Sequence, residues 1–397
     1  MRLLFAHDHR FLRGPAGELY TPGHLPASTW ERFLEHFEEV QVIARDGGPL
    51  PEGVRLGRSD HPAVAFDFLP NLSSLRRLVF RSPGIEERMR SAVQSADAVV
   101  ARLPSEIGLL ALKYARRLGK PYAVEVVGCA WEGTRTSGAA GARLYAPLAW
   151  SRARKAIGQA PLALYVTSSW LQGRYPTRGE AGFASNVTLE PLTAAASAHR
   201  KARLAALAKG TPPVLGTIAT LRVKYKGIQT AFEALARLRS SGIDLTYRIL
   251  GPGDQQPWKQ LASDHGVGDL VHFDGTRRAG PEVCAWLDDV DIYLQPSLTE
   301  GLPRAMIEAM SRGAACIGST RGGIPELLPP GRLHEPGDVA GLTQLIRSLA
   351  GDPAATAAAS EADLETARQF DPEALKKRRA EIYGRLKAQA EGRAHSR

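Results

Sequence analysis

Two glutamates, Glu300 and Glu308, stand eight positions apart in the segment TEGLPRAMIEAMSRGAACIGSTRGGIPELL. A carboxylate can hold a neutral group with paired hydroxyls, such as a ribose, by accepting a hydrogen bond from each hydroxyl. If a helix starts between them, Glu300 lies at its first turn and Glu308 about two turns further along. Ordinary surface glutamates have the same spacing, so the interpretation depends on the surrounding elements.

A group of cations precedes another predicted helix earlier in the chain. Arg222, Lys224 and Lys226 lie in RVKYKG, between a predicted strand at 213–218 and a predicted apolar helix at 228–238. Cations at a helix start can bind a diphosphate, each through a charge-assisted contact of roughly 1.5–3 kcal/mol. A solvated basic loop is the alternative.

The elements around the two glutamates alternate as in a parallel α/β sheet. Residues 291–297 predict a buried strand, Pro303 suits the first turn of the next helix, and Gly313 is expected to end it. Residues 314–318 predict another strand, and 321–326 predict a second glycine turn with a helix opening at proline. The carboxyl ends of parallel strands line a ligand crevice, so a diphosphate fits there.

The segment 300–328 resembles the donor-site signature of glycosyltransferase family 4, a retaining group with the GT-B fold, in its EGLPRAxIEAM and GGIPELL variant. The resemblance implies that the first glutamate lies beside the donor sugar and that the second binds the ribose. The residues after the first glutamate are implied to approach the sugar and phosphates. In this sequence the implied positions are Glu300, Glu308, Gly301, Leu302 and Pro303.

The resemblance also covers the cationic turn. Lys226 before Gly227 matches the family's phosphate-binding lysine. Gly216 and Thr217 stand where family members commonly have Gly-Arg, which leaves Arg222 or Lys224 to supply the missing charge. We therefore expect Glu300, Lys226 and Arg222 to be the catalytic residues.

Three further donor-site positions are expected, two of them from the same resemblance. The nucleotide base is implied to lie near 271–274, which assigns Val271 and His272 to the donor site. Gly251 belongs to the turn GPG at 251–253, where glycine lets the backbone approach a ligand closely. Turn geometry alone is the simpler role for this glycine.

The first half of the chain is expected to bind the acceptor. Strands are predicted at 2–7, 39–44, 96–102, 121–127 and 162–167, and a helix at 106–118. His7, His9 and Arg10 are placed just after the first strand, facing the cleft, in the loop HDHRFLRGPAGELYTPG, which replaces the family's usual glycine-rich loop. A His-x-His metal site lacks a convincing third ligand.

A second departure from the family lies after the strand at 121–127. Many family members have a histidine there, whereas this chain reads Gly128-Cys-Ala-Trp-Glu132. Glu132 or His9 is left to replace the missing hydrogen bond, and Cys129 is expected to be a small buried thiol. Departure of a diphosphate depends mainly on electrostatic stabilisation, so transfer remains possible, with Glu300 as a positioning and charge-stabilising group.

No metal or other cofactor is expected besides the nucleotide-diphosphate sugar as co-substrate. Asp289-Val-Asp291 is a formal D-x-D, a manganese signature in another class of glycosyltransferases. Its place between a predicted helix and a predicted strand favours ordinary turn residues instead.

The length of 397 residues with 44% apolar content suits two domains rather than one core. We expect an α/β protein of GT-B type, with two Rossmann-like domains whose parallel sheets face a central cleft. Residues 1–190 form the acceptor-binding domain, completed by a helix at 370–390 that crosses back to it, and 191–369 form the donor-binding domain. The polar segment 187–212 predicts a linker with a solvated helix.

The net charge of +10 favours anionic partners. The expected partners are a nucleotide-diphosphate sugar and a sugar or polyprenyl-linked acceptor, with no nucleic acid. Residues 75–81 and 143–155 mix basic and apolar side chains, which suits peripheral contact with an anionic membrane. Helices with one core face and one solvated basic face are the alternative. Three distant cysteines and the absence of a signal-peptide layout predict a cytoplasmic protein.

The predicted function is a retaining, hexosyltransferase-type glycosyltransferase in surface polysaccharide, lipopolysaccharide or other glycoconjugate biosynthesis. A non-catalytic nucleotide-sugar-binding protein and a GT-B nucleotide-sugar epimerase are the alternatives. Neither the base and sugar of the donor nor the acceptor follows from the residues.

Overall fold

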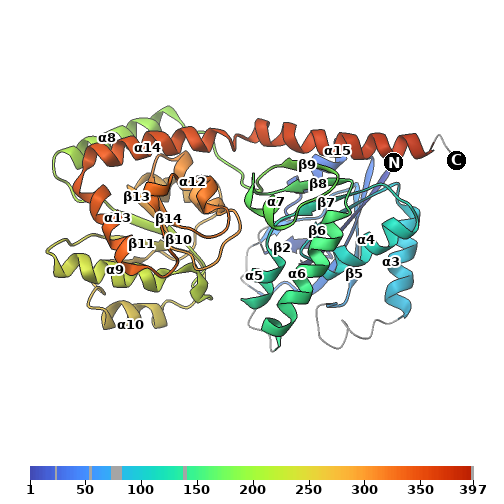
Figure 1. Ribbon diagram of the computed structural model, residues 1–397, viewed down its shortest axis with the longest axis horizontal. Helices are drawn as coiled ribbons and strands as arrows, with labels where there is room; N and C mark the ends of the chain where they lie inside the picture. The colour runs from blue at the N-terminus through green and yellow to red at the C-terminus, as the bar shows by residue number, and fades with distance from the viewer. Residues whose placement is uncertain (23–24, 53–55, 73–82, 137–140, 395–397) are drawn as a thin grey trace. The chain divides into compact units, whose positions relative to one another are not determined.

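The computed structural model describes the chain except for residues 23–24, 53–55, 73–82, 137–140 and 395–397. Its contacts divide the chain into two units (Figure 1). The first unit is Met1–Ala184 with Leu375–Arg397, and the second is Ser185–Ala374. Each unit is an α/β layer structure with its own sheet.

The described part of the first unit contains a nine-stranded sheet, in the order β4-β2-β1-β6-β7-β8-β9, with β3 paired to β1 and β5 to β3. The β2 pairings are antiparallel and the other strand pairings are parallel. The strands are β1 (Arg2–Arg13), β2 (Leu19–Thr21), β3 (Glu39–Pro49), β4 (Gly57–Arg58), β5 (Val64–Leu69), β6 (Ala98–Leu103), β7 (Tyr122–Val126), β8 (Leu162–Tyr165) and β9 (Glu180–Phe183). The helices are α1 (Ser28–Leu34), α3 (Pro83–Ser95), α4 (Glu106–Arg117), α5 (Ala130–Arg135), α6 (Ala142–Gly158), α7 (Trp170–Arg174) and α15 (Pro372–Ala394).

The central strands of this sheet are buried and mostly apolar, as is usual for parallel sheets. All residues of β6, AVVARL, are buried. Helix α4 begins at a side-chain cap, since the Ser105 hydroxyl accepts a hydrogen bond from the Gly108 N–H at 2.9 Å. The strands and the helix predicted in this half are confirmed, with shifted ends.

The largest shift is in β1, and it corrects the position of His7, His9 and Arg10. The first strand was expected to end at residue 7, but β1 continues to Arg13 and turns back through β2 as a hairpin. Buried Phe11 explains the extension, because its ring packs edge-on against Phe66 of β5 at 5.1 Å. The three predicted acceptor residues therefore lie within a strand, and the predicted loop is wrong.

The second unit has a six-stranded sheet in the order β12-β11-β10-β13-β14-β15 with parallel pairing throughout. The strands are β10 (Leu215–Ile218), β11 (Tyr247–Leu250), β12 (Val271–Phe273), β13 (Ile292–Gln295), β14 (Ala315–Ser319) and β15 (Leu333–His334). The helices are α8 (Ala194–Ala208), α9 (Ile228–Ser240), α10 (Gln256–Asp264), α11 (Pro281–Asp288), α12 (Arg304–Ser311), α13 (Val339–Gly351) and α14 (Pro353–Arg368), with 3-10 turns η1 (Lys224–Lys226), η2 (Ile324–Glu326) and η3 (Pro330–Arg332). The predicted strands and the helices at 228–238 and after Pro303 are confirmed, whereas the helix expected to open at the proline of 321–326 is only the 3-10 turn η2.

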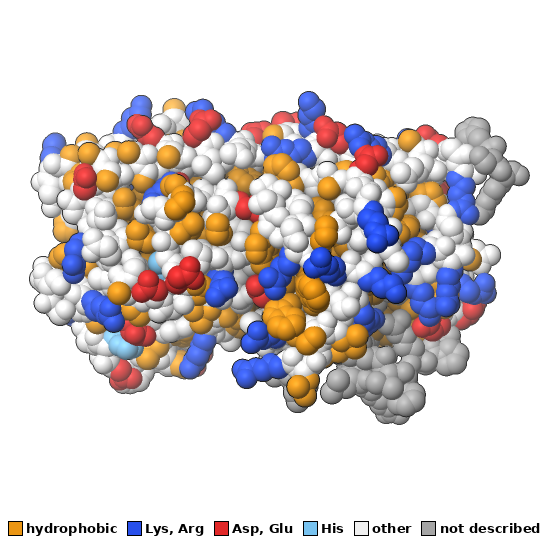
Figure 2. Space-filling view, in the orientation of Figure 1, with side chains coloured by type: hydrophobic (Ala, Val, Ile, Leu, Met, Phe, Trp, Pro, Cys, Tyr) orange, Lys and Arg blue, Asp and Glu red, His pale blue; other side chains and the backbone are white. Residues whose placement is uncertain are grey.

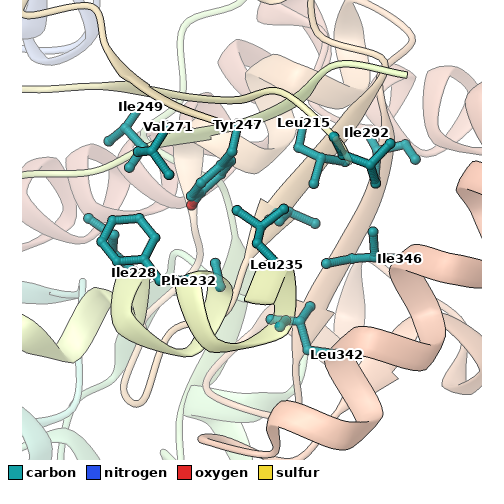
Figure 3. Close-up of a cluster of buried hydrophobic side chains, with 14 of the residues drawn as sticks. Leu215, Ile228, Phe232, Leu235, Tyr247, Ile249, Val271, Ile292, Leu342 and Ile346 are labelled. Carbon is teal, nitrogen blue, oxygen red and sulfur yellow. The ribbon is translucent and has the colours of Figure 1, made fainter. Parts of the chain in front are cut away.

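The core of the second unit lies between its sheet and helices α9 and α13 (Figure 3). Leu215, Tyr247 and Ile292 of the sheet pack against Phe232 of α9 and Ile346 of α13. Burying each such side chain contributes roughly 1.5–3 kcal/mol. This packing gives the carboxyl edge of the sheet a rigid base.

Helix α8 is not the solvated linker helix expected from its polar sequence. Arg200 is 5% exposed and donates from Nε to the Arg312 carbonyl at 2.9 Å. Arg203 donates two hydrogen bonds, at 2.8 and 2.6 Å, to the carboxylate of buried Asp291. The charges of α8 are thus paired inside the second unit, which a pattern of polar residues does not reveal.

The C-terminal helix α15 packs on the first unit, as predicted. Buried Tyr383 donates its hydroxyl hydrogen bond to Glu125 of β7, and its ring lies 4.9 Å from that of Phe33. The last helix therefore leaves the second unit and completes the first.

Candidate donor site

Three turns meet at the carboxyl edge of the second sheet, after β10, β13 and β14. The Leu298 N–H donates to the Tyr225 carbonyl at 2.8 Å, which joins the first two turns. The Gly323 N–H donates to the Gly301 carbonyl at 2.6 Å, which joins the second and third. The predicted neighbourhood of the two strand-to-helix turns is confirmed.

Two glycines allow this close approach. Gly227 has φ +76°, and a Cβ there would lie 1.9 Å from the Pro296 carbonyl oxygen. Gly322 has φ +61°, and a Cβ there would lie 2.2 Å from the Glu300 carbonyl oxygen. Only glycine combines this left-handed conformation with the absence of a side chain.

The turns bring Lys226 and Glu300 together as an ion pair. Lys226 Nζ lies 2.7 Å from Glu300 Oε2, with side chains 20% and 11% exposed. Ser297 Oγ and Gln295 Nε2 donate to the same carboxylate oxygen at 3.1 and 3.2 Å. Because an ammonium has three N–H donors, Lys226 keeps donors for an incoming anion.

Gln295 and Ser297 were missed as site residues. Both stand at the end of the strand predicted at 291–297, two positions apart and therefore on one face. Polar side chains on one face at the carboxyl end of an otherwise apolar strand were the available signal. Their role is to hold the Glu300 carboxylate in place.

Glu308 lies in the second half of α12 and is partly buried. Burial raises the pKa of its carboxyl group above the usual range, and nearby Arg304 opposes this effect only in part. Within the described ranges, the carboxylate has no hydrogen-bond partner. A partly buried carboxylate without these hydrogen bonds lowers the stability of the free protein, and it is able to accept hydrogen bonds from a ligand.

The start of α12 faces the same turns. Pro303 is the residue immediately before the helix and provides no side-chain cap. The positive end of the helix dipole at this start favours an anion. Gly301 and Leu302 precede them and are partly buried.

The remaining predicted donor residues occupy different environments. Thr217 is fully buried and donates to the Leu294 carbonyl at 2.8 Å, while Gly216 packs so tightly that a Cβ would lie 2.6 Å from Val290. The structure thus keeps both inside the sheet rather than at the edge with Lys226. Arg222 is exposed.

Val271 belongs to the hydrophobic core, and its neighbour His272 is exposed on strand β12. At Gly251, a Cβ would lie 1.9 Å from the Ala219 carbonyl oxygen. The contact explains the glycine by turn geometry alone.

In the first unit, the two histidines are engaged along β1. His7 Nδ1 lies 3.1 Å from the Arg102 carbonyl, so Nδ1 carries the proton because a carbonyl only accepts. Burial, followed by the charges of Arg102 and His9, lowers the pKa of His7 to about 3. His9 Nε2 lies 2.7 Å from Thr21 Oγ1. His7 is therefore neutral at physiological pH.

The segment at the position of the family histidine is partly buried. Cys129 is buried, as predicted, with its Sγ 3.1 Å from Arg174 Nε and 3.2 Å from Tyr175 Oη. Gly128 precedes it, and Glu132 lies in α5, where it is partly buried.

The D-x-D aspartates have protein partners. Asp291 binds Arg203, as above, and Asp289 Oδ1 lies 3.1 Å from His199 Nε2. Among the residues that the structure describes, no three His, Cys, Asp or Glu side chains are grouped as metal ligands. Of the two stretches predicted to contact a membrane, 75–81 lies outside the described residues and 143–155 lies entirely within α6. No described helix has the length and apolarity needed to cross a bilayer.

Solved structures resemble this chain over nearly its whole length. Sucrose-phosphate synthase from Thermosynechococcus elongatus matches with a TM-score of 0.67 at 16% identity, over 98% of this chain and 99% of that one. HepE of Anabaena, solved with UDP, matches with a TM-score of 0.63 at 18% identity, over 96% and 99%. The chain has the GT-B fold, as predicted.

Residues 212–352 match the family model described as glycosyl transferases group 1. This segment is similar to group 1 glycosyl transferase domains. It contains Lys226, Glu300 and Glu308, so the three converging turns lie within the matched segment.

Curated relatives extend the similarity. Protein CapJ of Staphylococcus aureus is 28% identical over 349 residues, which are 87% of this chain and 85% of CapJ. The amylovoran biosynthesis glycosyltransferase AmsK of Erwinia amylovora is 33% identical over 174 residues, 41% of this chain and 42% of AmsK. These matches support a glycosyltransferase of the GT-B fold.

Proposed function

We propose that the chain is a retaining glycosyltransferase of family 4. It moves a sugar from a nucleotide-diphosphate sugar to a hydroxyl acceptor in surface polysaccharide, lipopolysaccharide or other glycoconjugate biosynthesis, as a hexosyltransferase. The observation that carries the proposal is the 2.7 Å Lys226–Glu300 pair in the turns that precede α12. The name of AmsK supports the pathway.

The donor binds across the three turns. Lys226 and the first N–H groups of α12 hold the diphosphate, because both supply positive charge at the same edge. The partly buried carboxylate of Glu308 accepts hydrogen bonds from the ribose hydroxyls. The complexes of HepE with UDP and UDP-glucose support a donor of this class.

Transfer proceeds by departure of the nucleotide diphosphate. The bond between the anomeric carbon and the diphosphate oxygen breaks, and the acceptor oxygen bonds to the same face of that carbon. Because the new bond forms on the face that the diphosphate leaves, the anomeric configuration is retained. The leaving phosphate oxygen takes the acceptor's hydroxyl proton. Lys226, with Arg222, stabilises the charge that develops on the phosphate, and Glu300 positions the sugar. The chemistry needs no cofactor besides the donor.

Release of nucleotide diphosphate from the correct donor tests the proposal. Lys226→Met and Glu300→Gln should each lower turnover by roughly 100-fold or more, because each removes charge at the reacting phosphate or sugar. Lys259→Met is the matched control, since Lys259 is an exposed lysine on α10 of the same unit. Unchanged rates in both site variants would refute the assignment.

Product analysis in the same assay separates the alternatives. A non-catalytic binder releases no nucleotide diphosphate, and an epimerase changes the sugar without transferring it. The anomeric configuration of the product, determined by NMR, tests retention.

Helix α6 supports a peripheral membrane location on the cytoplasmic face, as a second part of the proposal. Leu144 and Leu148 are 88% and 54% exposed, one helical turn apart, with exposed Arg143 and Arg154 on the same helix. Figure 2 shows hydrophobic and basic side chains gathered over this region of the first unit. Apolar and cationic side chains together complement an anionic bilayer, which suits a polyprenyl-linked acceptor.

A further inference from the structure

Two arginines face each other across neighbouring strands of the first unit. Arg10 of β1 and Arg45 of β3 are register partners in a parallel pair, directly after an irregularity between Ala6 and Arg10. Register partners point to the same face of a sheet. Like charges in such cross-strand positions destabilise the sheet unless something compensates them.

The neighbouring carboxylates provide that compensation only in part. Asp8 accepts hydrogen bonds from the Glu106 and Ile107 N–H groups, at 2.6 and 3.4 Å, at the start of α4. Asp46 pairs with Arg13 at 2.8 Å. In the described part of the chain, neither the Arg10 nor the Arg45 guanidinium makes a hydrogen bond or an ion pair with a carboxylate.

The charges of the two arginines influence each other. Burial lowers the pKa of Arg45, the charge of Arg10 lowers it further, and Asp8 opposes both effects. Arg45 is partly buried and Arg10 is exposed. The register thus places two like charges on one face of the sheet, and partial burial removes part of the hydration of Arg45.

The location of the pair suits ligand binding. It lies towards the carboxyl ends of β1 and β3, the edge at which open parallel sheets bind ligands. Two guanidinium groups present planar forks of N–H donors, which match the oxygens of a carboxylate or phosphate. An oxyanion between them would replace repulsion with two charge-assisted contacts.

We propose that Arg10 and Arg45 form an oxyanion-binding site, and that the acceptor sugar carries a carboxylate or phosphate group that binds there. The acceptor role rests on the proposed function, whereas anion binding by the pair does not. The acceptor is then a uronic acid or a phosphorylated sugar rather than a neutral one.

Calorimetric titration of the full chain with glucuronate, glucose 6-phosphate and glucose tests the site. The charged sugar of the correct class should bind about tenfold or more tightly than glucose, and the tighter of the two identifies the oxyanion. Arg10→Gln and Arg45→Gln should each remove this preference. Arg13→Gln is the matched control on the same strand, because Arg13 already has Asp46 as its partner.

Thermal unfolding provides a second readout. Inorganic phosphate should raise the Tm of the wild type and of Arg13→Gln, but not of Arg45→Gln. Without anions, Arg45→Gln should be at least as stable as the wild type, because it removes a like-charge contact. Equal binding of charged and neutral sugars, or an equal loss in the Arg13 control, would overturn the site.

Binding of UDP separates this proposal from the proposed function. The Arg10 and Arg45 variants should bind UDP as the wild type does, since the donor site lies in the second unit. If no nucleotide sugar is turned over but the preference for charged sugars persists, the transfer reaction fails and the anion site stands. If transfer occurs and the preference is absent, only the anion site fails.

Discussion

Glu308 is the residue at which binding and stability oppose each other most clearly. Its carboxylate is partly buried and has no hydrogen-bond partner among the described residues, so the free protein loses stability by holding the charged form. A ribose would supply the missing hydrogen bonds. The same side chain therefore weakens the fold and strengthens donor binding.

Glu308→Gln should separate these effects. The free protein should gain up to about 1 kcal/mol of unfolding free energy at pH 7, since no charge remains to be desolvated. Donor affinity should fall, because an amide offers one acceptor oxygen instead of two. Chemical denaturation and nucleotide-sugar titration measure the two quantities. A variant that binds the donor as tightly as the wild type would contradict the ribose assignment.

The raised pKa of Glu308 also gives a pH dependence. For a carboxyl group whose pKa is higher in the folded than in the unfolded protein, the cost of burial is fully present above the folded pKa and disappears as pH falls below the unfolded one. Donor affinity should decline as pH falls through the raised pKa. Glu308→Gln should lack this step.

At the scale of elements, the donor site depends on how closely the turns after β13 and β14 approach. A Cβ at Gly322 would collide with the Glu300 carbonyl oxygen, so the two turns approach this closely only with glycine at position 322. Glu300 lies in the turn after β13, which is hydrogen-bonded to the turn that holds Lys226 and to the turn after β14. Movement of the turn after β13 or β14 therefore changes the position of Glu300 relative to Lys226.

Gly322→Ala should destabilise the protein by roughly 1–3 kcal/mol and reduce turnover, because the new Cβ must push the two turns apart. Gly242→Ala is the matched control: Gly242 has φ +77° but nothing within 4 Å of its Cβ position. The difference between the variants in thermal unfolding and turnover isolates the steric effect from backbone strain. Equal effects of the two substitutions would exclude a steric role for Gly322.

Two elements show why sequence patterns predict element ends poorly. In β1, the polar run His7 to Arg10 suggested a loop, yet Phe11 beyond it packs in the core and extends the strand. In α8, the charged pattern suggested solvent, yet Arg200 and Arg203 bind the buried Asp291. In both cases a partner remote in sequence outweighed local polarity.

At the scale of the whole molecule, α15 is bound to the first unit through a buried charged cluster. Burial alone would raise the pKa of Glu125, but Arg32 and Arg102 lower it below the usual range, and the Tyr383 hydroxyl adds a hydrogen bond. The resulting stability is present above the unfolded pKa of the carboxyl group and is lost as pH falls through the folded one.

Tyr383→Phe should lower the unfolding free energy of the protein by roughly 1–3 kcal/mol, because Glu125 loses a buried donor. Tyr114→Phe is the control, since the Tyr114 hydroxyl binds Glu86, whose side chain is 22% exposed and reaches solvent. Thermal unfolding of both variants measures the difference. A Tyr383 variant as stable as the control would show that the hydroxyl does not secure α15.

The proposed membrane contact depends on the apolar side chains that α6 exposes at the protein surface. The double variant Leu144→Ser with Leu148→Ser should co-sediment less than the wild type with vesicles containing anionic lipid at low salt, because it removes the exposed apolar side chains. Leu192→Ser is the control, as Leu192 is an exposed leucine of the second unit. Absence of wild-type binding at low salt would contradict the proposal.

The sequence by itself determined the local features of this protein. The buried strands, the helix that begins after Pro303 and ends before Gly313, and the spacing of Glu300 and Glu308 are set within a few residues by apolar periodicity and backbone preference. Apolar periodicity and backbone preference depend on neighbouring residues only, so they can be recognised in the sequence alone.

Only the tertiary structure decided which distant residues meet. Lys226 and Glu300 are 74 positions apart, and Tyr383 and Glu125 are 258 apart. The register of β1 with β3 placed Arg10 beside Arg45, and packing left the Glu308 carboxylate partly buried with no hydrogen bond from the described residues. Strand register and core packing arise from the sum of many long-range contacts, so no single motif specifies them.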